Sequence, residues 1–385
     1  MSEFKITVPE GIATPFYYYD MPLLRATADA AAKAAANPAF RIHYAMKANN
    51  EEPVLETMLN AGFGIDAVSG GEVALAIDCG FDASKIVFAG VGKSDSEIRI
   101  ALDAGIGCFN IESIEELEVI VEIAESEGKI APVAVRVNPD IDAHTHHYIT
   151  TGLKENKFGV SMDMLDTAIK IIQNSEWLSL IGLHFHIGSQ VTTMKPYEIL
   201  CERVNALQDK YESRGIAFKT INLGGGLGID YDNPDASPVP DFKGLFETVS
   251  RNLRIRAGQE VHFELGRSLV AQCGSLISKV LYVKRGLEKN FVIVDAGFTD
   301  LIRPAFYGAH HLIQNLTSKS EETETYDVVG PICESSDTFG QEEVLPVTRR
   351  GDLIAFRSAG AYGSVMSMCY NCRRLPGAYF YDVSR

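Results

Sequence analysis

The sequence predicts a (β/α)8 TIM-like barrel and a C-terminal β domain that also takes in the N-terminal strands. From about residue 41, eight short runs rich in β-branched and aromatic residues alternate with longer amphipathic stretches, which is typical of a parallel sheet flanked by helices. Polar residues gather where these runs end, as they do on the catalytic face of such barrels. After about residue 272, short strands follow one another across turns. The pattern alone leaves an open doubly wound sheet as the alternative to a barrel.

The runs that we expect to form the barrel are Ile42–Met46, Phe63–Val68, Ile86–Ala89, Cys108–Ile111, Val133–Val137, Ile181–Ile187, Thr220–Leu223 and Val261–Glu264. Helix start and stop signals lie between them: Ser94 with Glu97, Ser113 with Glu116, and Pro196 with Gly215. Because strand and helix alternate throughout this region, we expect residues 20–271 to form one barrel domain.

The rest of the chain is predicted to form a separate β domain. Its expected strands are Ser275–Val283, Phe291–Val294, Tyr326–Val329, Glu343–Val347 and Leu353–Phe356, with turns and no helices between them. The N-terminal runs Phe4–Val8 and Phe16–Tyr19 also read as strands and are expected to complete its sheet. The predicted second domain therefore comprises residues 1–19 and 272–385.

Composition narrows the class of protein. The 385 residues are 46% hydrophobic, and a formal net charge of -16 argues against nucleic acid or an anionic membrane as a partner. No apolar run is long enough to span a bilayer, and the first residues lack the features of a signal peptide, so we expect a cytoplasmic protein. Seven scattered cysteines favour reduced thiols, and we interpret the pair Cys369 and Cys372 as structural.

Lys47 follows the first apolar run directly, within Tyr44-Ala45-Met46-Lys47-Ala48-Asn49. A lysine beside a buried strand is unusual unless it has a partner or a function. One interpretation is that Lys47 lies beyond the strand end and points into water. The other is an amine in a dry pocket, able to form a Schiff base with a carbonyl such as that of pyridoxal phosphate.

Two polar motifs follow the last two predicted barrel strands. The glycine run Gly224-Gly225-Gly226 would let backbone N–H groups approach a phosphate, although a tight turn explains the same residues. Glu264 would hold a pyridine nitrogen protonated, and Arg267 would meet a phosphate or a substrate carboxylate. An ion pair between Glu264 and Arg267 across the turn is the simpler alternative.

The sixth predicted strand ends in His184-Phe185-His186-Ile187-Gly188-Ser189-Gln190. Alternation puts His184 and His186 on the same side of the strand, where one would stack on a cofactor ring, and Ser189 would bind phosphate. A metal site is the competing idea, with His144, His146 and His147 as a second cluster. No carboxylate stands at ligand spacing, however, so we predict no metal.

Cys333-Glu334-Ser335-Ser336-Asp337 lies in the predicted β domain. Most lone cysteines are buried packing groups. The acidic neighbours of Cys333 suit a proton donor better than a nucleophile.

These motifs together resemble the pyridoxal-phosphate decarboxylases built on an alanine-racemase-like barrel. The resemblance also includes Gly360-Ala361-Tyr362-Gly363, and it runs nearly from end to end. Two further stretches, Thr151–Gly159 and Leu301–Tyr307, are similar to the branch of this family that decarboxylates meso-2,6-diaminopimelate. Leu265 and Ser336 depart from the family, which usually has proline and glycine there, and we expect them to change loop geometry only.

The resemblance implies a pyridoxal 5'-phosphate cofactor and a role for each matching residue. Lys47 would carry the cofactor as a Schiff base, His186 would stack on its ring, Glu264 would pair with the pyridine nitrogen, and Cys333 would protonate the carbanion. The remaining implied cofactor-binding residues are Asp66, Ser189, Gly224, Gly225, Gly226, Gly266, Arg267 and Tyr362. The implied substrate-binding residues are Arg267, Arg303, Tyr307, Glu334 and Tyr362.

The implied reaction converts meso-2,6-diaminopimelate to L-lysine and carbon dioxide, the last step of lysine biosynthesis. The far end of this substrate is a zwitterion, so burying it requires a cation and an anion, and Arg303 with Glu334 would supply them. The resemblance also implies a homodimer in which the second subunit provides Cys333 and Glu334. Alternatives are an ornithine or arginine decarboxylase, an alanine racemase, which Glu264 argues against, and a non-catalytic cofactor-binding homologue.

Overall fold

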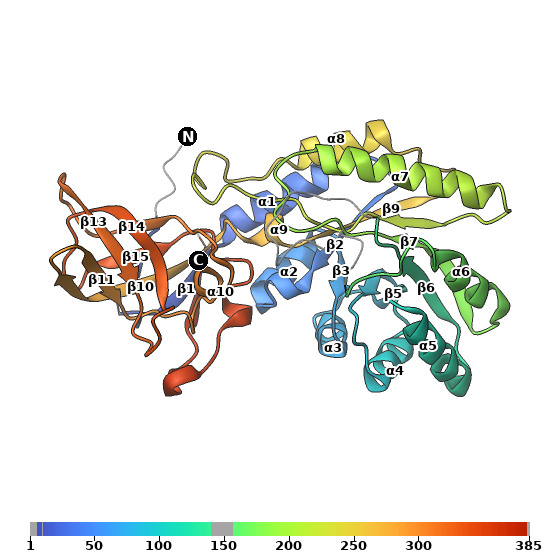
Figure 1. Ribbon diagram of the computed structural model, residues 1–385, viewed down its shortest axis with the longest axis horizontal. Helices are drawn as coiled ribbons and strands as arrows, with labels where there is room; N and C mark the ends of the chain where they lie inside the picture. The colour runs from blue at the N-terminus through green and yellow to red at the C-terminus, as the bar shows by residue number, and fades with distance from the viewer. Residues whose placement is uncertain (1–5, 10, 140–156, 383–385) are drawn as a thin grey trace. The chain divides into compact units, whose positions relative to one another are not determined.

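Eight parallel strands, β2 to β9, close into a barrel in the computed structural model (Figure 1). The structure describes residues 6–9, 11–139 and 157–382. The chain divides into two units, which we call the barrel unit (28–228 and 241–266) and the β unit (1–27, 229–240 and 267–385). The closed ring confirms the barrel predicted from the sequence and excludes the open sheet.

Every barrel strand overlaps one of the predicted apolar runs. The strands are β2 (Phe40–Ala45), β3 (Gly64–Ala67), β4 (Ile86–Phe88), β5 (Cys108–Ile111), β6 (Ala131–Arg136), β7 (Leu178–His184), β8 (Thr220–Asn222) and β9 (Glu260–Leu265). Strand β9 pairs with β2 as well as with β8, which completes the ring. The periodicity of the sequence therefore reports the strand order correctly.

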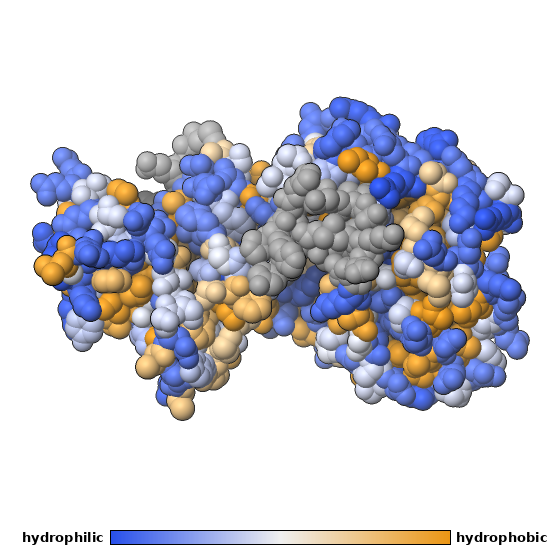
Figure 2. All heavy atoms as spheres, viewed as in Figure 1, coloured by the Kyte–Doolittle hydropathy of each residue, from blue (hydrophilic) through white to orange (hydrophobic). Residues whose placement is uncertain are grey.

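Helices surround these strands (Figure 1). They are α2 (Glu52–Asn60), α3 (Gly70–Asp78), α4 (Asp95–Ala104), α5 (Ile114–Glu127), α6 (Leu165–Asn174), α7 (Lys195–Glu212) and α8 (Phe242–Asn252), while the residues of α1 (Met21–Ala34) fall in both units. The predicted caps are present: the Glu97 carboxylate accepts from the backbone N–H of Ser94, and the Ser113 hydroxyl accepts from that of Glu116. The outward face of α7 and α8 is largely hydrophilic (Figure 2), as expected for amphipathic helices packed on a barrel.

A layer of polar side chains lies inside the barrel. Side chains alternate between the two faces of a strand, so residues two apart point the same way. Inward positions on most of the strands carry a buried polar residue, among them Asp66 on β3, Asn110 on β5, His184 on β7, Asn222 on β8 and Glu264 on β9. A parallel barrel normally fills its interior with branched apolar residues, so this layer marks the interior as a candidate site.

The β unit contains a mostly antiparallel sheet in the order β12-β15-β10-β11-β13-β14, with β1 joined to β10 and β16. Its strands are β1 (Phe16–Asp20), β10 (Gly274–Arg285), β11 (Asn290–Val294), β12 (Ile313–Asn315), β13 (Thr323–Val329), β14 (Thr338–Pro346), β15 (Leu353–Phe356) and β16 (Gly377–Tyr381). The predicted β fold is confirmed, and the N-terminal strand β1 belongs to its sheet.

Three details of this unit differ from the sequence prediction. A short helix, α10 (Arg303–Tyr307), stands where only turns were expected, because Pro304 starts it and the left-handed Gly308 ends it. Strands β12 and β16 were not predicted. Of the expected strand Phe4–Val8, the described part is not a strand: the side chains of Ile6 and Val8 pack on a core cluster around Phe16 instead.

Candidate active site

Lys47 is held against a buried carboxylate of the barrel unit. It lies in a 3-10 turn (Met46–Ala48) that follows β2 directly, and its Nζ atom is 2.5 Å from Oδ2 of Asp66 on the neighbouring strand β3. The Lys47 side chain is 39% exposed, whereas that of Asp66 is 1% exposed. The amine is therefore neither buried in a dry core nor directed only at solvent, because it reaches inward to an acid at the strand ends.

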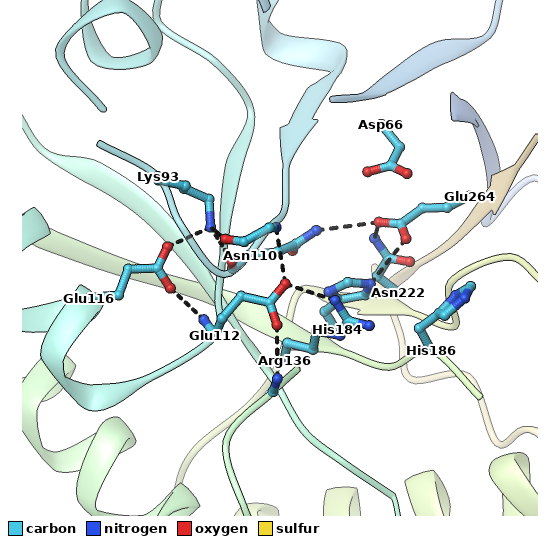
Figure 3. Close-up of polar contacts among 12 residues, drawn as sticks. Asp66, Lys93, Asn110, Glu112, Glu116, Arg136, His184, His186, Asn222 and Glu264 are labelled. Carbon is cyan, nitrogen blue, oxygen red and sulfur yellow. Dashed lines mark hydrogen bonds and ion pairs between the residues drawn. The ribbon is translucent and has the colours of Figure 1, made fainter. Parts of the chain in front are cut away.

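Glu264 occupies the centre of the polar layer and accepts three hydrogen bonds (Figure 3). The donors are Asn222 Nδ2 at 2.7 Å, His184 Nε2 at 3.0 Å and Asn110 Nδ2 at 3.3 Å. Burial alone would raise the pKa of Glu264, but the nearby His184 and Lys47 outweigh it and lower the pKa below its usual value. Glu264 is thus fixed in place as an anion by residues of three other strands.

The pKa of Asp66 is raised by its burial close to the Glu264 anion. Burial, followed by the negative charge of Glu264, raises the pKa of Asp66 to about 7, although Lys47 acts in the opposite direction. Its buried Oδ1 atom has no hydrogen-bond partner among the described residues. Two carboxylates so close in a buried site cannot both ionise freely, so one of them is held ready to bind a proton.

His186, two residues beyond His184, is kept neutral. Its Nδ1 atom accepts a hydrogen bond of 3.2 Å from the backbone N–H of Gly225, and burial together with the charge of Arg136 lowers its pKa to about 3. Lys47 and Glu264 also influence this pKa. The imidazole, the amine and the carboxylate therefore belong to one electrostatic neighbourhood, and an uncharged ring suits stacking on a flat heterocycle.

The glycine run forms a loop after β8 that pairs with the loop after β7. The backbone N–H of Val191 donates to Gly226 (2.8 Å), and that of Gly228 donates to Val191 (2.9 Å), which brings the segment containing Ser189 beside the glycines. A Cβ atom on Gly225 would lie 2.0 Å from the carbonyl oxygen of Glu264. The loop packing itself thus requires glycine, and the same bare backbone is available to an anion.

The residues of the barrel unit fit pyridoxal phosphate. An aldehyde needs an amine, which Lys47 supplies, and a pyridine nitrogen needs a fixed anion, which Glu264 supplies. A phosphate needs exposed backbone amides or hydroxyls, which the glycine loop and the Ser189 segment offer. Gly266 follows β9, where a Cβ atom would lie only 3.1 Å from Cβ of Ala45, so the chain passes close to the strand that leads to Lys47.

A second cluster lies within the β unit and brings together Arg267, Arg303 and Tyr362. The Arg267 guanidinium lies over the Tyr362 ring, 5.0 Å from its centroid. Both arginines contact Tyr231: Nη1 of Arg267 is 2.6 Å from the Tyr231 hydroxyl, and the Arg303 guanidinium is 5.0 Å from the ring centroid. Both arginine residues are buried, with 6% and 7% exposure. Three of the sequence-predicted substrate residues therefore adjoin one another.

Tyr307 lies near this cluster, because it helps to raise the pKa of Arg267, whereas Cys333 and Glu334 contact a different segment of the β unit. Tyr307 packs edge-on against Phe306 of α10. Cys333 and Glu334 are exposed, and their loop is tied to the segment around Tyr370, whose hydroxyl donates to Glu334 at 3.0 Å. An exposed cysteine and glutamate on a fastened loop are available to another molecule.

Sequence reasoning missed several residues that support one or the other of these clusters. The sequence assigns Asn110 no role, and it presents His184 only as one member of a histidine pair. Asn222 and Tyr231 were not singled out, and neither was His311, which contacts Arg303. Inward-facing polar residues on buried strands were the signal for the asparagines; nothing local marks Tyr231 or His311.

Some predicted features fall on residues that are not described. The histidines at 144, 146 and 147 lie outside the described residues, as does most of the stretch 151–159. Within the described part of the chain, no group of three or more His, Cys, Asp or Glu residues is arranged to hold a metal ion. The helices described there include none that is long and apolar enough to cross a membrane.

Comparison with known proteins connects these features to a family. A model of the pyridoxal binding domain of pyridoxal-dependent decarboxylases matches residues 23–271. Diaminopimelate decarboxylase of Bacteroides thetaiotaomicron is 57% identical over 380 residues, which cover 98% of each chain. The crystal structure of the Helicobacter pylori diaminopimelate decarboxylase complexed with L-lysine superposes with a TM-score of 0.91 at 38% identity, covering 97% of this chain and 93% of that one.

A more distant structure shares the fold alone. Lysine/ornithine decarboxylase from Vibrio vulnificus, complexed with cadaverine, has a TM-score of 0.83 at 23% identity and covers 97% of this chain and 96% of its own. The identity to the Bacteroides enzyme is much higher, at 57% over 98% of each chain. The chain therefore belongs to the pyridoxal-dependent decarboxylase family and, within it, to the diaminopimelate decarboxylases.

Proposed function

We propose that this protein is a carboxy-lyase that uses pyridoxal 5'-phosphate to convert meso-2,6-diaminopimelate to L-lysine and carbon dioxide. The observation that carries the choice of substrate is the pair of buried guanidiniums, Arg267 and Arg303, in the β unit. Two buried cations suit a substrate that brings a second carboxylate. Ornithine has only an amine at its far end, which a cationic pocket would repel.

The cofactor-binding domain proposed here spans residues 20–271. Lys47 would be the attachment point, and the neutral His186 imidazole would stack on the ring. The phosphate would be held by Ser189, by the glycine loop and by the backbone around Gly266. When bound, pyridoxal phosphate supplies an electron-withdrawing ring that accepts the electron pair left behind by carbon dioxide.

Three ionisable residues of the chain, Glu264, Asp66 and Cys333, would hold or transfer protons during the reaction. Glu264 would keep a proton on the pyridine nitrogen of a bound cofactor, because its lowered pKa and its three donors maintain it as an anion. Asp66 balances the Lys47 ammonium while the amine is free and binds a proton readily once that partner is gone. Cys333 would serve as the proton donor to the substrate carbon, a role that requires the protonated thiol.

The far end of the substrate is recognised by charge. Arg303, with Arg267 and the hydroxyl groups of Tyr307 and Tyr362, binds the remaining carboxylate, and Glu334 binds the neighbouring ammonium. Burying a zwitterion is favourable only when both charges are paired. The substrate must therefore carry both charges at the correct spacing.

We further propose a cytoplasmic homodimer in which each active site takes Cys333 and Glu334 from the partner subunit. Both residues are exposed on a loop of the chain's own β unit. Asp337 anchors that loop, because its carboxylate accepts hydrogen bonds from the backbone N–H groups of Phe298 (2.6 Å) and Ile332 (2.7 Å). A fixed, outward-directed pair is what a shared site requires.

The deciding experiment is an assay of purified protein supplied with pyridoxal phosphate. Release of carbon dioxide is measured from diaminopimelate, ornithine and arginine, and racemisation is measured with alanine. We expect turnover of diaminopimelate alone, and a mass increase on the peptide containing Lys47 after borohydride reduction. Turnover of ornithine but not diaminopimelate, or cofactor attachment at another lysine, would contradict the proposal.

A further inference from the structure

Tyr231 connects the two buried arginines of the β unit. Its hydroxyl accepts a hydrogen bond of 2.6 Å from Nη1 of Arg267, and the Arg303 guanidinium packs over its ring at 5.0 Å. Burial would raise the pKa of Tyr231, but the positive charges of Arg267 and Arg303 more than offset this effect and lower it. The phenol oxygen is therefore an electron-rich acceptor that draws two like charges together.

His311 fixes the other side of Arg303. Its Nδ1 atom is 2.8 Å from the carbonyl oxygen of Arg357, which can only accept, so Nδ1 carries the proton. Its Nε2 atom must then accept the hydrogen bond of 2.7 Å from Nη1 of Arg303. Burial and the charge of Arg303 lower the pKa of His311 to about 3, so the ring stays neutral and keeps this acceptor.

The loop that carries Tyr231 is itself fastened to the β unit. Arg357 Nη2 forms an ion pair of 2.7 Å with Oδ1 of Asp235, and Nε2 of Gln272 donates to the carbonyls of Pro234 (3.1 Å) and Ser237 (2.8 Å). These contacts explain why residues 229–240 group with the β unit although they interrupt the barrel sequence. Tyr231 is thus presented by a held segment rather than by a free loop.

Arg303 lacks the partner that a buried cation usually has. Among the residues that the structure describes, no carboxylate forms an ion pair with it, and its contacts are an imidazole and a phenol. Burial and the charge of Arg267 lower its pKa. A buried guanidinium that is oriented but not neutralised is complementary to an incoming anion.

We propose that Tyr231 and His311 are positioning residues that hold Arg267 and Arg303 as one receptor for the carboxylate at the far end of the substrate. The inference rests on the proposed function, because it assigns a geometry to the same substrate site. Tyr231 controls the separation of the two guanidiniums and His311 controls the orientation of Arg303. Specificity then depends on two residues that need not touch the substrate.

The test compares two ligands of the protein loaded with pyridoxal phosphate. L-Lysine retains the far carboxylate, whereas 1,5-diaminopentane has the same chain and amines without any carboxylate. Dissociation constants are measured by calorimetry and by the change in cofactor absorbance, so turnover is not needed. The native protein should prefer lysine. Tyr231→Phe keeps the ring and removes the oxygen, and we expect it to weaken lysine binding by about tenfold or more, with diaminopentane binding changed by less than about twofold.

Matched variants separate positioning from folding. Tyr326→Phe removes another hydroxyl of the β unit, one that bonds to Glu324, and should leave the preference for lysine intact. His311→Gln retains an acceptor where Nε2 stands, whereas His311→Asn retains only the bond at the Nδ1 position. We expect the preference for lysine to survive in His311→Gln and to fall in His311→Asn.

The kinetic signature should agree with the binding data. In Tyr231→Phe the KM for diaminopimelate should rise by about tenfold while kcat changes little, because the lost interaction is made before and during reaction alike. An unchanged preference for lysine in Tyr231→Phe, or equal weakening of both ligands, would overturn the inference. Failure of the native protein to decarboxylate diaminopimelate would instead overturn the proposed function, and the two outcomes are therefore distinguishable.

Discussion

Nζ of Lys47 lies 2.5 Å from Oδ2 of Asp66, across the pairing of β2 with β3. A carboxylate at this distance stabilises the ammonium form, yet only the neutral amine attacks an aldehyde. We predict that Asp66→Asn increases the rate of cofactor attachment at pH 7 by a few fold, on the order of the effect of one ion pair whose lysine is partly exposed to solvent. The rise of cofactor absorbance after mixing measures this rate; a slower rise would show that Asp66 assists attachment.

Removing the charge of Glu264 should separate binding from chemistry. Glu264→Gln keeps an acceptor for Asn222 but no longer holds a proton on the pyridine nitrogen. We expect kcat to fall by about a hundredfold or more, the size seen when one preorganised electrostatic contact is lost. Cofactor attachment at Lys47, followed by mass spectrometry, should persist. A variant with native kcat would remove Glu264 from the mechanism.

Arg303→Ala tests the substrate end independently of the cofactor. The variant lacks a buried guanidinium, so we predict that the KM for diaminopimelate rises by about tenfold to a hundredfold, as expected for a charge-assisted hydrogen bond. Titration with pyridoxal phosphate serves as the control and should give the native affinity. Native kinetics in this variant would place the carboxylate elsewhere.

A shared active site makes a quantitative prediction for mixed subunits. Lys47→Ala and Cys333→Ala should each be inactive, since each lacks one half of every site. If the two are unfolded and refolded together in equal amounts, half of the dimers contain one variant of each kind, and one of their two sites is native. Activity should recover to about a quarter of the native value by this symmetry argument. No recovery would indicate that both residues come from the same chain.

Acid stability should depend on His43, a buried residue of β2. Burial and the neighbouring His262 lower the pKa of His43 from 6.5 to about 3. The unfolded chain therefore binds a proton between pH 6.5 and 3 that the folded chain does not, so stability is lost as the pH falls through this window. His43→Phe removes this term. Between pH 7 and pH 5 the native protein should lose about 2 kcal/mol more unfolding free energy than the variant, by linkage at 1.4 kcal/mol per pKa unit.

Urea unfolding at several pH values measures this difference. His43→Phe also loses the hydrogen bond to the carbonyl of Lys85, so its absolute stability at pH 7 should be lower. The diagnostic quantity is the slope with pH. Parallel slopes for the two proteins would mean that His43 becomes protonated without unfolding.

Much of the fold follows from periodicity. The apolar runs Ile42–Met46, Ile181–Ile187 and Val261–Glu264 indicated strands correctly, because a parallel barrel buries both faces of every strand and leaves little freedom in the pattern. The short helix α10 was missed because Pro304 and Gly308, its start and stop signals, stand only four residues apart. Five residues carry no helical period that sequence reading could detect.

The residues that support the site could not be predicted from the sequence, for a different reason. Glu264 could be predicted as a site residue because it is a polar residue at a strand end. Its partners Asn110 and Asn222 could not, because they lie 154 and 42 residues away in the chain. Tyr231 stood in a proline-rich loop that reads as a connection. What selects these residues is a contact made only after folding, and neither composition nor spacing encodes it.

The three donors to Glu264 come from β5, β7 and β8, and Glu264 itself is on β9, the strand that closes the ring against β2. A barrel that lacks β9 cannot form the hydrogen-bonded Glu264 site, even when the cofactor is supplied. A nascent chain therefore gains its coenzyme site only when the last strand has docked, and truncation before residue 264 would yield a protein that vitamin supplementation could not rescue.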